Sequence, residues 1–152
     1  MKRKVRLTES YLYKIVKESV NQFIQWFAGS KVVDKDGKPL LLYHAFESNG
    51  FDGSYDSGLV FYTTDYNYAC EFGDIVDSGY LKLLNPYITK DGKLRKKDGT
   101  VIIDEDGYEM TTGYLDALSD DDLCYFTDNY DGVISEDGFM VVSFRDNNFY
   151  KI

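Results

Sequence analysis

The chain has 152 residues, with 43% hydrophobic and 16% aromatic content, which is enough to bury the core of one domain. Its net charge of -9 argues against nucleic acid as a general partner, because phosphate binding requires a basic face. The longest apolar run is far shorter than the roughly 20 residues of a transmembrane helix, so we expect no membrane contact.

The first 28 residues are expected to form a basic leader followed by an amphipathic helix. The leader carries four basic residues, Lys2, Arg3, Lys4 and Arg6. No apolar signal-peptide core follows them, so secretion is not expected. Apolar residues at helical spacing then lie between Thr8, a suitable N-cap, and Gly29, a helix stop. These residues are Leu12, Ile15, Val16, Val20, Phe23, Ile24 and Phe27. The helix either docks on the body or serves as a detachable, partner-binding segment.

Residues 29–152 read as one domain of short strands. In "SKVVDKDGKPLLLYHAF", two apolar runs flank Asp36-Gly37, a composition typical of a hairpin turn. His44, the only histidine, is expected to end the second strand. The strand "GLVFYTTD" follows, and Asp65 is a suitable cap for a short helix through Ala69 and Phe72.

The second half of the chain continues this pattern. The strand "GYLKLLNP" stops at Pro86, and Asp-Gly pairs at 91–92 and 98–99 divide residues 87–104 into small hairpins. Ser119 opens a short acidic helix. The strands "DGVIS" and "FMVVSF" close the chain. The fold class predicted by this order is α+β.

The usual catalytic motifs do not occur in the sequence. It contains no CxxC, HExxH, P-loop or Gly-rich dinucleotide fingerprint, and its single histidine has neither GxSxG nor a second metal-type ligand beside it. Hydrolase and metalloenzyme functions are therefore weak hypotheses, and we expect no metal. Cys70 and Cys124 lie in unlike contexts and share no metal-type spacing with the single histidine, which favours a reduced intracellular compartment, although a disulfide between them is an alternative.

Four blocks in a fixed order resemble the ADP-ribosyltransferase superfamily. They are "WFAGSKVVDKDGKPLLLYHAF", "GLVFYTTDYNYACEF", "YLKLLNPYI" and "NYDGVI...VVSF". They are most similar to the small ADP-ribosyltransferase-like domains of phage polyvalent proteins. The resemblance implies split antiparallel sheets with NAD bound between the His44 strand and the next aromatic strand.

The resemblance also implies the site residues. His44 would bond a ribose hydroxyl of NAD, and the small Ala45 would expose backbone to the nicotinamide carboxamide. Aromatic rings would stack on the nicotinamide. Strand alternation lets only one of Phe61 and Tyr62 face the pocket, so both are named. The implied NAD contacts are Tyr43, His44, Ala45, Phe61, Tyr62, Thr63 and Phe72, and the implied catalytic residues are His44, Tyr62 and Asp137.

The last strand departs from the family pattern. The position expected to hold Glu or Gln is Met140, and the nearest acids are Glu136 and Asp137. Cleavage of NAD passes through a cation-like sugar that a fixed carboxylate stabilises. Two hypotheses follow, namely a transferase that uses Asp137 and a catalytically inactive binding or virion-associated module with the same fold. Charge mimicry of nucleic acid is a weaker third, because the acids cluster in turns.

The leader carries a second resemblance. "RLTESYLYKIVKESVNQ" resembles a leader of small phage-encoded proteins, and Leu7-Thr8-Glu9 fits the Leu-x-Glu pattern cut by phage prohead proteases. This implies a phage protein that acts in the cytoplasm of a bacterial host and is packaged in the virion through its leader. The implied partners are NAD and a host protein or nucleic-acid acceptor.

Overall fold

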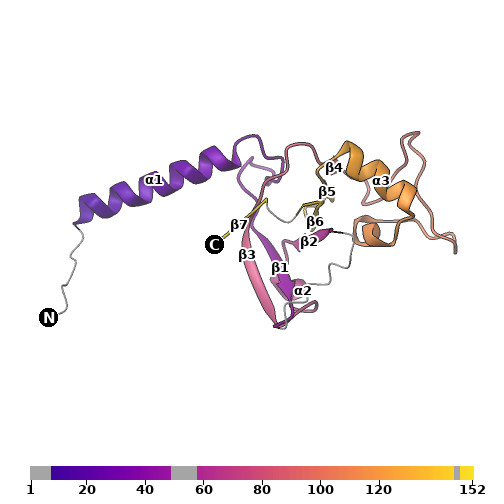
Figure 1. Cartoon of the computed structure of the whole chain (residues 1–152), viewed down its shortest axis with the longest axis horizontal. Helices are drawn as coiled ribbons and strands as arrows, with labels where there is room; N and C mark the ends of the chain where they lie inside the picture. Colours follow the sequence, from indigo (N-terminus) through magenta and orange to yellow (C-terminus); the bar gives the residue numbers. More distant parts are fainter. Residues whose placement is uncertain (1–7, 49–57, 146–147) are drawn as a thin grey trace.

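A computed structural model describes residues 8–48, 58–145 and 148–152. The fold is mixed α+β, with α1 at one end of a single sheet and α3 at the other (Figure 1). The helices are α1 (Glu9–Phe27), α2 (Tyr66–Ala69), the 3-10 helix η1 (Thr112–Ala117) and α3 (Asp120–Asn129). The strands are β1 (Leu42–Phe46), β2 (Val60–Thr63), β3 (Ile75–Leu81), β4 (Tyr87–Ile88), β5 (Gly132–Ile134), β6 (Met140–Ser143) and β7 (Phe149–Lys151).

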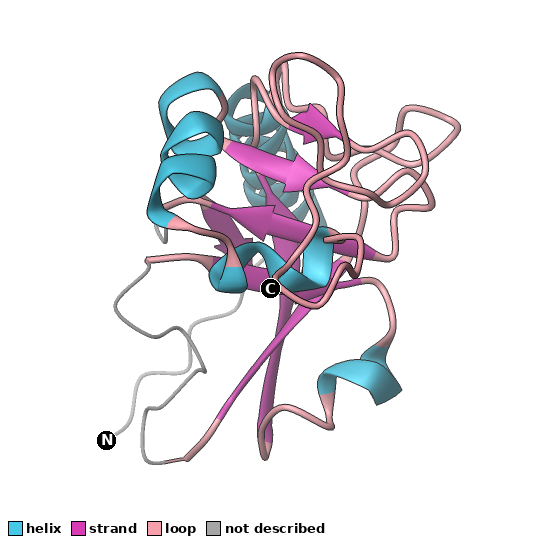
Figure 2. Ribbon diagram, turned by 90° about the vertical axis from the view of Figure 1, so that its right-hand side faces the viewer, coloured by secondary structure: helices cyan, strands magenta, loops and turns pink. Residues whose placement is uncertain are grey.

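The strands form one hydrogen-bonded sheet of seven, in the order β4-β5-β6-β2-β1-β3-β7. Figure 2 shows that the strand direction changes strongly across it. The α+β prediction is confirmed. The expected split antiparallel sheets differ from the observed arrangement, because the sheet is continuous and β4 runs parallel to β5.

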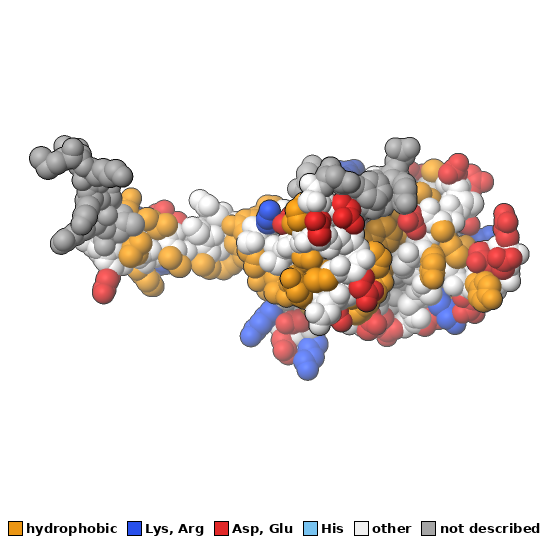
Figure 3. Space-filling model, turned by 90° about the horizontal axis from the view of Figure 1, so that it is seen from below, with side chains coloured by type: hydrophobic (Ala, Val, Ile, Leu, Met, Phe, Trp, Pro, Cys, Tyr) orange, Lys and Arg blue, Asp and Glu red, His pale blue; other side chains and the backbone are white. Residues whose placement is uncertain are grey.

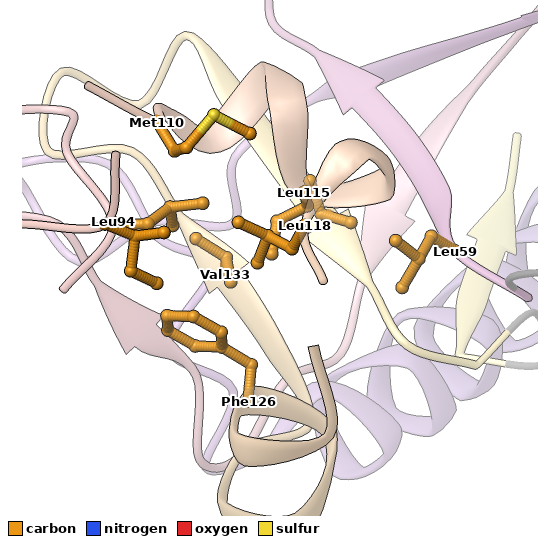
Figure 4. Close-up of a cluster of buried hydrophobic side chains, with 9 residues drawn as sticks. Leu59, Leu94, Met110, Leu115, Leu118, Phe126 and Val133 are labelled. Carbon is orange, nitrogen blue, oxygen red and sulfur yellow. The ribbon is translucent and has the colours of Figure 1, made fainter. Parts of the chain in front are cut away.

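Both faces of the central strands are buried. Along β6, Val142 enters one cluster of buried side chains and its neighbour Val141 enters another, as the two-residue period of a strand requires. The first, here called the α3 cluster, is shown in Figure 4 and comprises Leu59, Leu94, Ile102, Met110, Leu115, Leu118, Phe126, Val133 and Val142. It packs η1 and α3 against the sheet.

The second cluster, here called the strand cluster, is built mainly from strands. Leu42 of β1 and Leu81 of β3 are fully buried in it together with Val141 of β6. Residues from distant strands of one sheet share this core because the sheet curls. Its members are Val32, Leu42, Val60, Tyr62, Leu81, Leu83, Ile134 and Val141.

Helix starts follow the predicted caps. The Thr8 side chain accepts the N–H of Tyr11 at 3.2 Å and begins α1. Asp65 accepts the N–H of Tyr68 at 3.1 Å and begins α2. Ser119 likewise caps α3. The three caps are confirmed, although α2 ends before Phe72. A capping side chain satisfies one of the backbone donors left free at a helix start.

The first predicted hairpin is only partly formed. Its turn is confirmed, since Gly37 has φ 78° and the N–H of Asp34 bonds the Lys38 carbonyl at 2.8 Å. Only an isolated bridge, Val33 to Pro39, joins its arms. The expectation that His44 ends its strand is wrong. β1 continues to Phe46, because Ala45 and Phe46 pair with β3.

Most of α1 lies away from the body (Figures 1 and 3). Among the described residues, its aromatic contacts with the body come from its last turns, as where the ring of Phe23 lies 5.1 Å from those of Tyr80 and Tyr150. Of the two alternatives left open by the sequence, docking on the body therefore describes only the last turns of α1. The exposed apolar residues are Tyr11, Leu12, Tyr13, Ile15, Val16, Val20 and Ile24. Within the described ranges, no helix has the length and apolar character to cross a bilayer.

Residues 89–111 form a lobe that supports η1. The hairpin predicted around Asp98-Gly99 is confirmed by the bridge from Arg95 to Val101. A second bridge, from Lys93 to Thr111, brings the chain to the start of η1. The lobe contributes Leu94, Ile102 and Met110 to the α3 cluster, which fixes η1 over the sheet.

Candidate functional site

A cavity of about 230 Å³ opens beside β1 and β2. All seven residues expected to contact NAD line it: Tyr43, His44, Ala45, Phe61, Tyr62, Thr63 and Phe72. The other described residues of the lining are Tyr68, Ala69, Gly113, Asp116 and Met140. The site therefore joins two neighbouring strands to α2, η1 and the first residue of β6.

The imidazole of His44, on β1, reaches across to the backbone of β2. The two strands pair where Tyr43 faces Thr63, and at the next residue the His44 Nδ1 atom lies 2.9 Å from the carbonyl oxygen of Phe61. A carbonyl can only accept, so Nδ1 carries the proton in this bond. In the neutral ring Nε2 is then the acceptor nitrogen. The backbone bond thus fixes both the orientation and the tautomer of the imidazole.

Phe61 and Tyr62 belong to different cores. Tyr62 is only 4% exposed, and its ring lies 4.9 Å from Phe149 and 5.3 Å from His44. Phe61 is half-buried and packs against the α3 cluster. Atoms of both residues line the cavity. Phe61 is therefore more exposed to solvent than Tyr62, and the buried Tyr62 ring packs beside the His44 imidazole.

The segment of α2 and the residues after it form an aromatic corner. Tyr68 and Phe72 have ring centroids 5.0 Å apart and planes 67° apart. Phe72 is 59% exposed, so its ring stands at the mouth of the cavity. Ala69 between them is buried and small, which leaves the space between the rings and the strands open.

The opposite wall comes from β6 and η1. Met140 pairs with Thr63 and lines the cavity, so the position expected to hold Glu or Gln does face the site. A Cβ placed on Gly113 would lie 3.7 Å from the sulfur of Met140. Asp116 of η1 is the carboxylate among the described lining residues. It is exposed to solvent at the rim.

Sequence reasoning gave Asp116 and Gly113 no role. They belong to an irregular 3-10 segment, with non-helical angles at Tyr114, that carries no recognisable pattern. Its position depends on Leu115, which is fully buried in the α3 cluster. Tyr68 was expected on the short helix after Asp65, but no role in the site was predicted for it. The one feature of the sequence that could have indicated a role is its spacing of four residues from Phe72, which places the two rings side by side on a helix.

Asp137 lies outside this cavity lining and stabilises a turn. Its Oδ1 atom accepts the Phe139 N–H at 2.9 Å and the Ser135 hydroxyl at 2.7 Å. These bonds hold the pKa of Asp137 below its ordinary value. The residue expected to act as the catalytic carboxylate is thus a turn residue, and Asp116 takes its place among the candidates.

Other candidate chemistry is sparse in the part of the chain that the structure describes. There, no three His, Cys, Asp or Glu side chains are grouped as metal ligands. Cys70 and Cys124 are free and exposed, which corrects the alternative of a disulfide between them. In comparisons with known proteins, no family model, no curated protein and no solved structure matches the chain.

Proposed function

We propose that the chain has an ADP-ribosyltransferase-like fold, binds NAD in this cavity and transfers ADP-ribose to a macromolecule of a bacterial host. One observation carries the proposal. Residues from three separate stretches of sequence, 43–45, 61–63 and Phe72, were expected at one NAD site and converge on one cavity.

The cavity suits the nicotinamide end of NAD. A volume of about 230 Å³ lies below the roughly 300–1,000 Å³ of pockets that enclose a whole drug-sized ligand. It accommodates one ring with part of its ribose, and the remainder of NAD lies outside. The His44 Nε2 atom accepts a hydrogen bond from a ribose hydroxyl, and the aromatic corner of Tyr68 and Phe72 holds the ring.

The reaction breaks the bond between the nicotinamide nitrogen and C1′ of the ribose. The bonding electrons leave with nicotinamide, and an acceptor nucleophile forms the new bond to C1′ and loses its proton. The intervening sugar is cation-like and is stabilised by negative charge. We assign this role to Asp116, the carboxylate at the rim. Asp116 lies on η1 and takes the role of the Glu or Gln expected on the last strand, where this chain has Met140.

Met140 also favours a second function. A thioether at the position that faces the site cannot stabilise a cation as a carboxylate does, so the chain is alternatively a catalytically inactive module that binds NAD. This module would still use His44 and Phe72 for binding. Both functions predict that the chain binds NAD, and only the transferase function predicts that NAD is turned over.

The test combines labelled NAD, bacterial lysate and four proteins. The wild type is compared with H44A, F72A and, as a control, Y108A. Phe72 is 59% exposed and Tyr108 is 72% exposed, so neither substitution threatens the core, but only Phe72 lines the cavity. We expect H44A and F72A to reduce label transfer at least tenfold and Y108A to leave it unchanged. Thermal unfolding verifies that each variant is folded.

The outcomes separate the hypotheses. Transfer that is unchanged in both H44A and F72A contradicts the proposed site. A thermal shift on adding NAD, without release of nicotinamide, favours the inactive module. The absence of both contradicts NAD as the ligand. D116N tests the assigned carboxylate separately, with loss of turnover expected at nearly unchanged NAD affinity.

The biological setting is also a proposal. The resemblance of the leader supports a phage protein that is packaged in the virion and acts in the bacterial cytoplasm. The basic residues of the leader and Leu7 of the Leu7-Thr8-Glu9 pattern lie outside the described residues. Mass spectrometry of purified virions, read for a new N-terminus after Glu9, tests the cleavage.

A further inference from the structure

An apolar stripe runs along α1 and is covered by the body at one end. Leu12, Val16 and Val20 follow one another at a spacing of four, which places them on one face of the helix. The same face continues through Phe23 and Phe27, because each lies two turns after one of these valines. The body covers the stripe at the two phenylalanines, whereas residues 9–20, here called the arm, leave it exposed (Figure 3).

This exposure is unfavourable for a short helix. The exposed fraction of the large apolar side chains of the arm ranges from 40% at Ile15 to 70% at Tyr13. Isolated helices shorter than about 12–15 residues are marginal in water, and an amphipathic helix gains most of its stability by packing its apolar face. A contiguous apolar surface of several hundred Å² typically marks a site of association. The arm therefore has the properties of a helix that packs against a partner.

The distribution of charge along the chain indicates which partner fits. The leader, residues 1–7, has four basic residues and no acid, a charge of +4, and α1 is neutral because it has two Lys and two Glu. Since the whole chain carries -9, residues 28–152 carry -13. Two such bodies repel each other at close range, whereas the leader is attracted to either of them. A neutral apolar arm thus separates a basic end from an acidic body.

A second copy of the chain satisfies both features when the two arms run antiparallel. Pairing centred on Val16 places Leu12 opposite the partner's Val20, so the stripe covers itself about a two-fold axis. The leader of each copy then begins beside the acidic body of the other. The bodies attach about 20 Å apart along the helices, well beyond the Debye length of about 8 Å at physiological salt. Parallel arms would instead bring the two bodies side by side, and the two leaders likewise.

We propose that the chain associates with a second copy of itself through the arm of α1, as an antiparallel dimer in which each basic leader contacts the acidic body of the partner. The exposed apolar side chains of the arm offer roughly 500 Å² per copy, from the usual areas of aliphatic and aromatic side chains. A total of about 1,000 Å² is at the lower limit of specific interfaces and is typical of reversible complexes. We therefore expect a Kd on the order of 10–100 µM.

Sedimentation velocity of the full chain, from about 1 to about 500 µM, measures this association. We expect a monomer at the lowest concentration, where unfolding experiments report on the monomer alone, and a dimer at the highest. V16E should raise the Kd at least tenfold, because two carboxylates would face each other across the two-fold axis. The matched control is N21E, since Asn21 is also exposed but lies two turns after Lys14, on the polar face. Its Kd should equal that of the wild type.

Disulfide trapping tests the orientation of the arms. Cys70 and Cys124 are free and exposed, so both are first replaced by serine. Antiparallel arms bring residue 12 beside the partner's residue 20 and keep the two copies of residue 12 about 12 Å apart along the helices, too far for a disulfide. We therefore expect an oxidised mixture of L12C and V20C chains to form a disulfide-linked dimer, and L12C alone to form none.

A charge reversal tests the contact of the leader with the partner's body. K4E changes the charge of the leader from +4 to about +2, so it should raise the Kd several-fold. K97E makes the same change at an exposed lysine of the body and should have a smaller effect, because the body is already strongly acidic. The described lining of the cavity includes no residue of α1, so V16E should bind NAD as the wild type does.

The outcomes do not depend on whether the chain binds NAD. A monomer at about 500 µM overturns the inference, and so does a dimer that V16E leaves intact. A disulfide formed by L12C alone overturns the antiparallel arrangement, and an unchanged Kd in K4E overturns the contact of the leader. Binding of the monomer to anionic lipid vesicles, lost in V16E, would identify a lipid surface as the occupant of the stripe and overturn self-association.

Discussion

At the scale of single residues, the site depends on backbone groups as much as on side chains. The Phe61 carbonyl fixes the His44 tautomer, and this contact exists because β1 and β2 separate after Tyr43 and Thr63. A histidine in a fully paired strand would have no such carbonyl beside it. The local separation of two strands therefore converts an ordinary strand residue into an oriented acceptor.

Asp137 gives the first prediction at this scale. Its folded pKa is lower than the unfolded value of about 3.9, so its stabilisation is complete above that pH and is lost as the pH falls through the folded pKa. D137N should lower the free energy of unfolding at pH 7 by about 0.5–1 kcal/mol, a figure reduced for solvent screening. Urea unfolding should show this difference shrinking between pH 5 and about pH 2.

The same variant tests the placement of Asp137 relative to the site. Its carboxylate bonds Ser135 and Phe139 in a turn and does not line the cavity, so D137N should bind NAD as the wild type does. A loss of stability that is the same at all pH values, or a large loss of NAD binding, would contradict this role.

At the scale of elements, α1 combines an exposed arm with an anchored end. Leu12 is 44% exposed, whereas Phe27 is 9% exposed and its ring stacks on Phe23 at 5.6 Å. L12Q should therefore change the free energy of unfolding by less than about 0.5 kcal/mol. F27A should lower it by about 3 kcal/mol, because it removes a buried ring and leaves a cavity.

Chemical denaturation of both variants checks this division of α1. Tyr13, which is 70% exposed, provides a matched aromatic control, and Y13A should resemble L12Q. Comparable destabilisation by L12Q and F27A would mean that the whole helix is docked on the body in solution.

The elements also show how much the sequence could predict. Caps at Thr8, Asp65 and Ser119 were predictable, because a side-chain oxygen before a helix acts through local hydrogen bonds. The convergence of His44 with the aromatic strand was predicted from ordered motifs. The role of η1 was not predictable, since Asp116 reaches the cavity only because Leu115 is buried in the α3 cluster. That placement depends on packing between segments far apart in the sequence.

At the scale of the whole molecule, the curl of the sheet explains why the site lies where it does. A flat sheet of this order would leave one face of its central strands in water. Here the sheet curls around the strand cluster, while η1 and α3 cover the other face. The cavity lies beside the strands where these two layers meet, and it therefore collects residues from both halves of the chain.

Adjacent residues of β6 provide the test of this arrangement. Val141 and Val142 are both fully buried, but Val141 packs in the strand cluster and Val142 in the α3 cluster. Each substitution by alanine should therefore lower the free energy of unfolding by about 2–3 kcal/mol, from lost burial plus the cavity left behind. I88A, at an edge-strand residue that is 55% exposed, should cost much less. If one face of the sheet were exposed to solvent, one of the two valine side chains would lie on that face, because side chains alternate along a strand. That variant would then be as mildly destabilised as I88A. Urea unfolding of the three variants distinguishes the two cases.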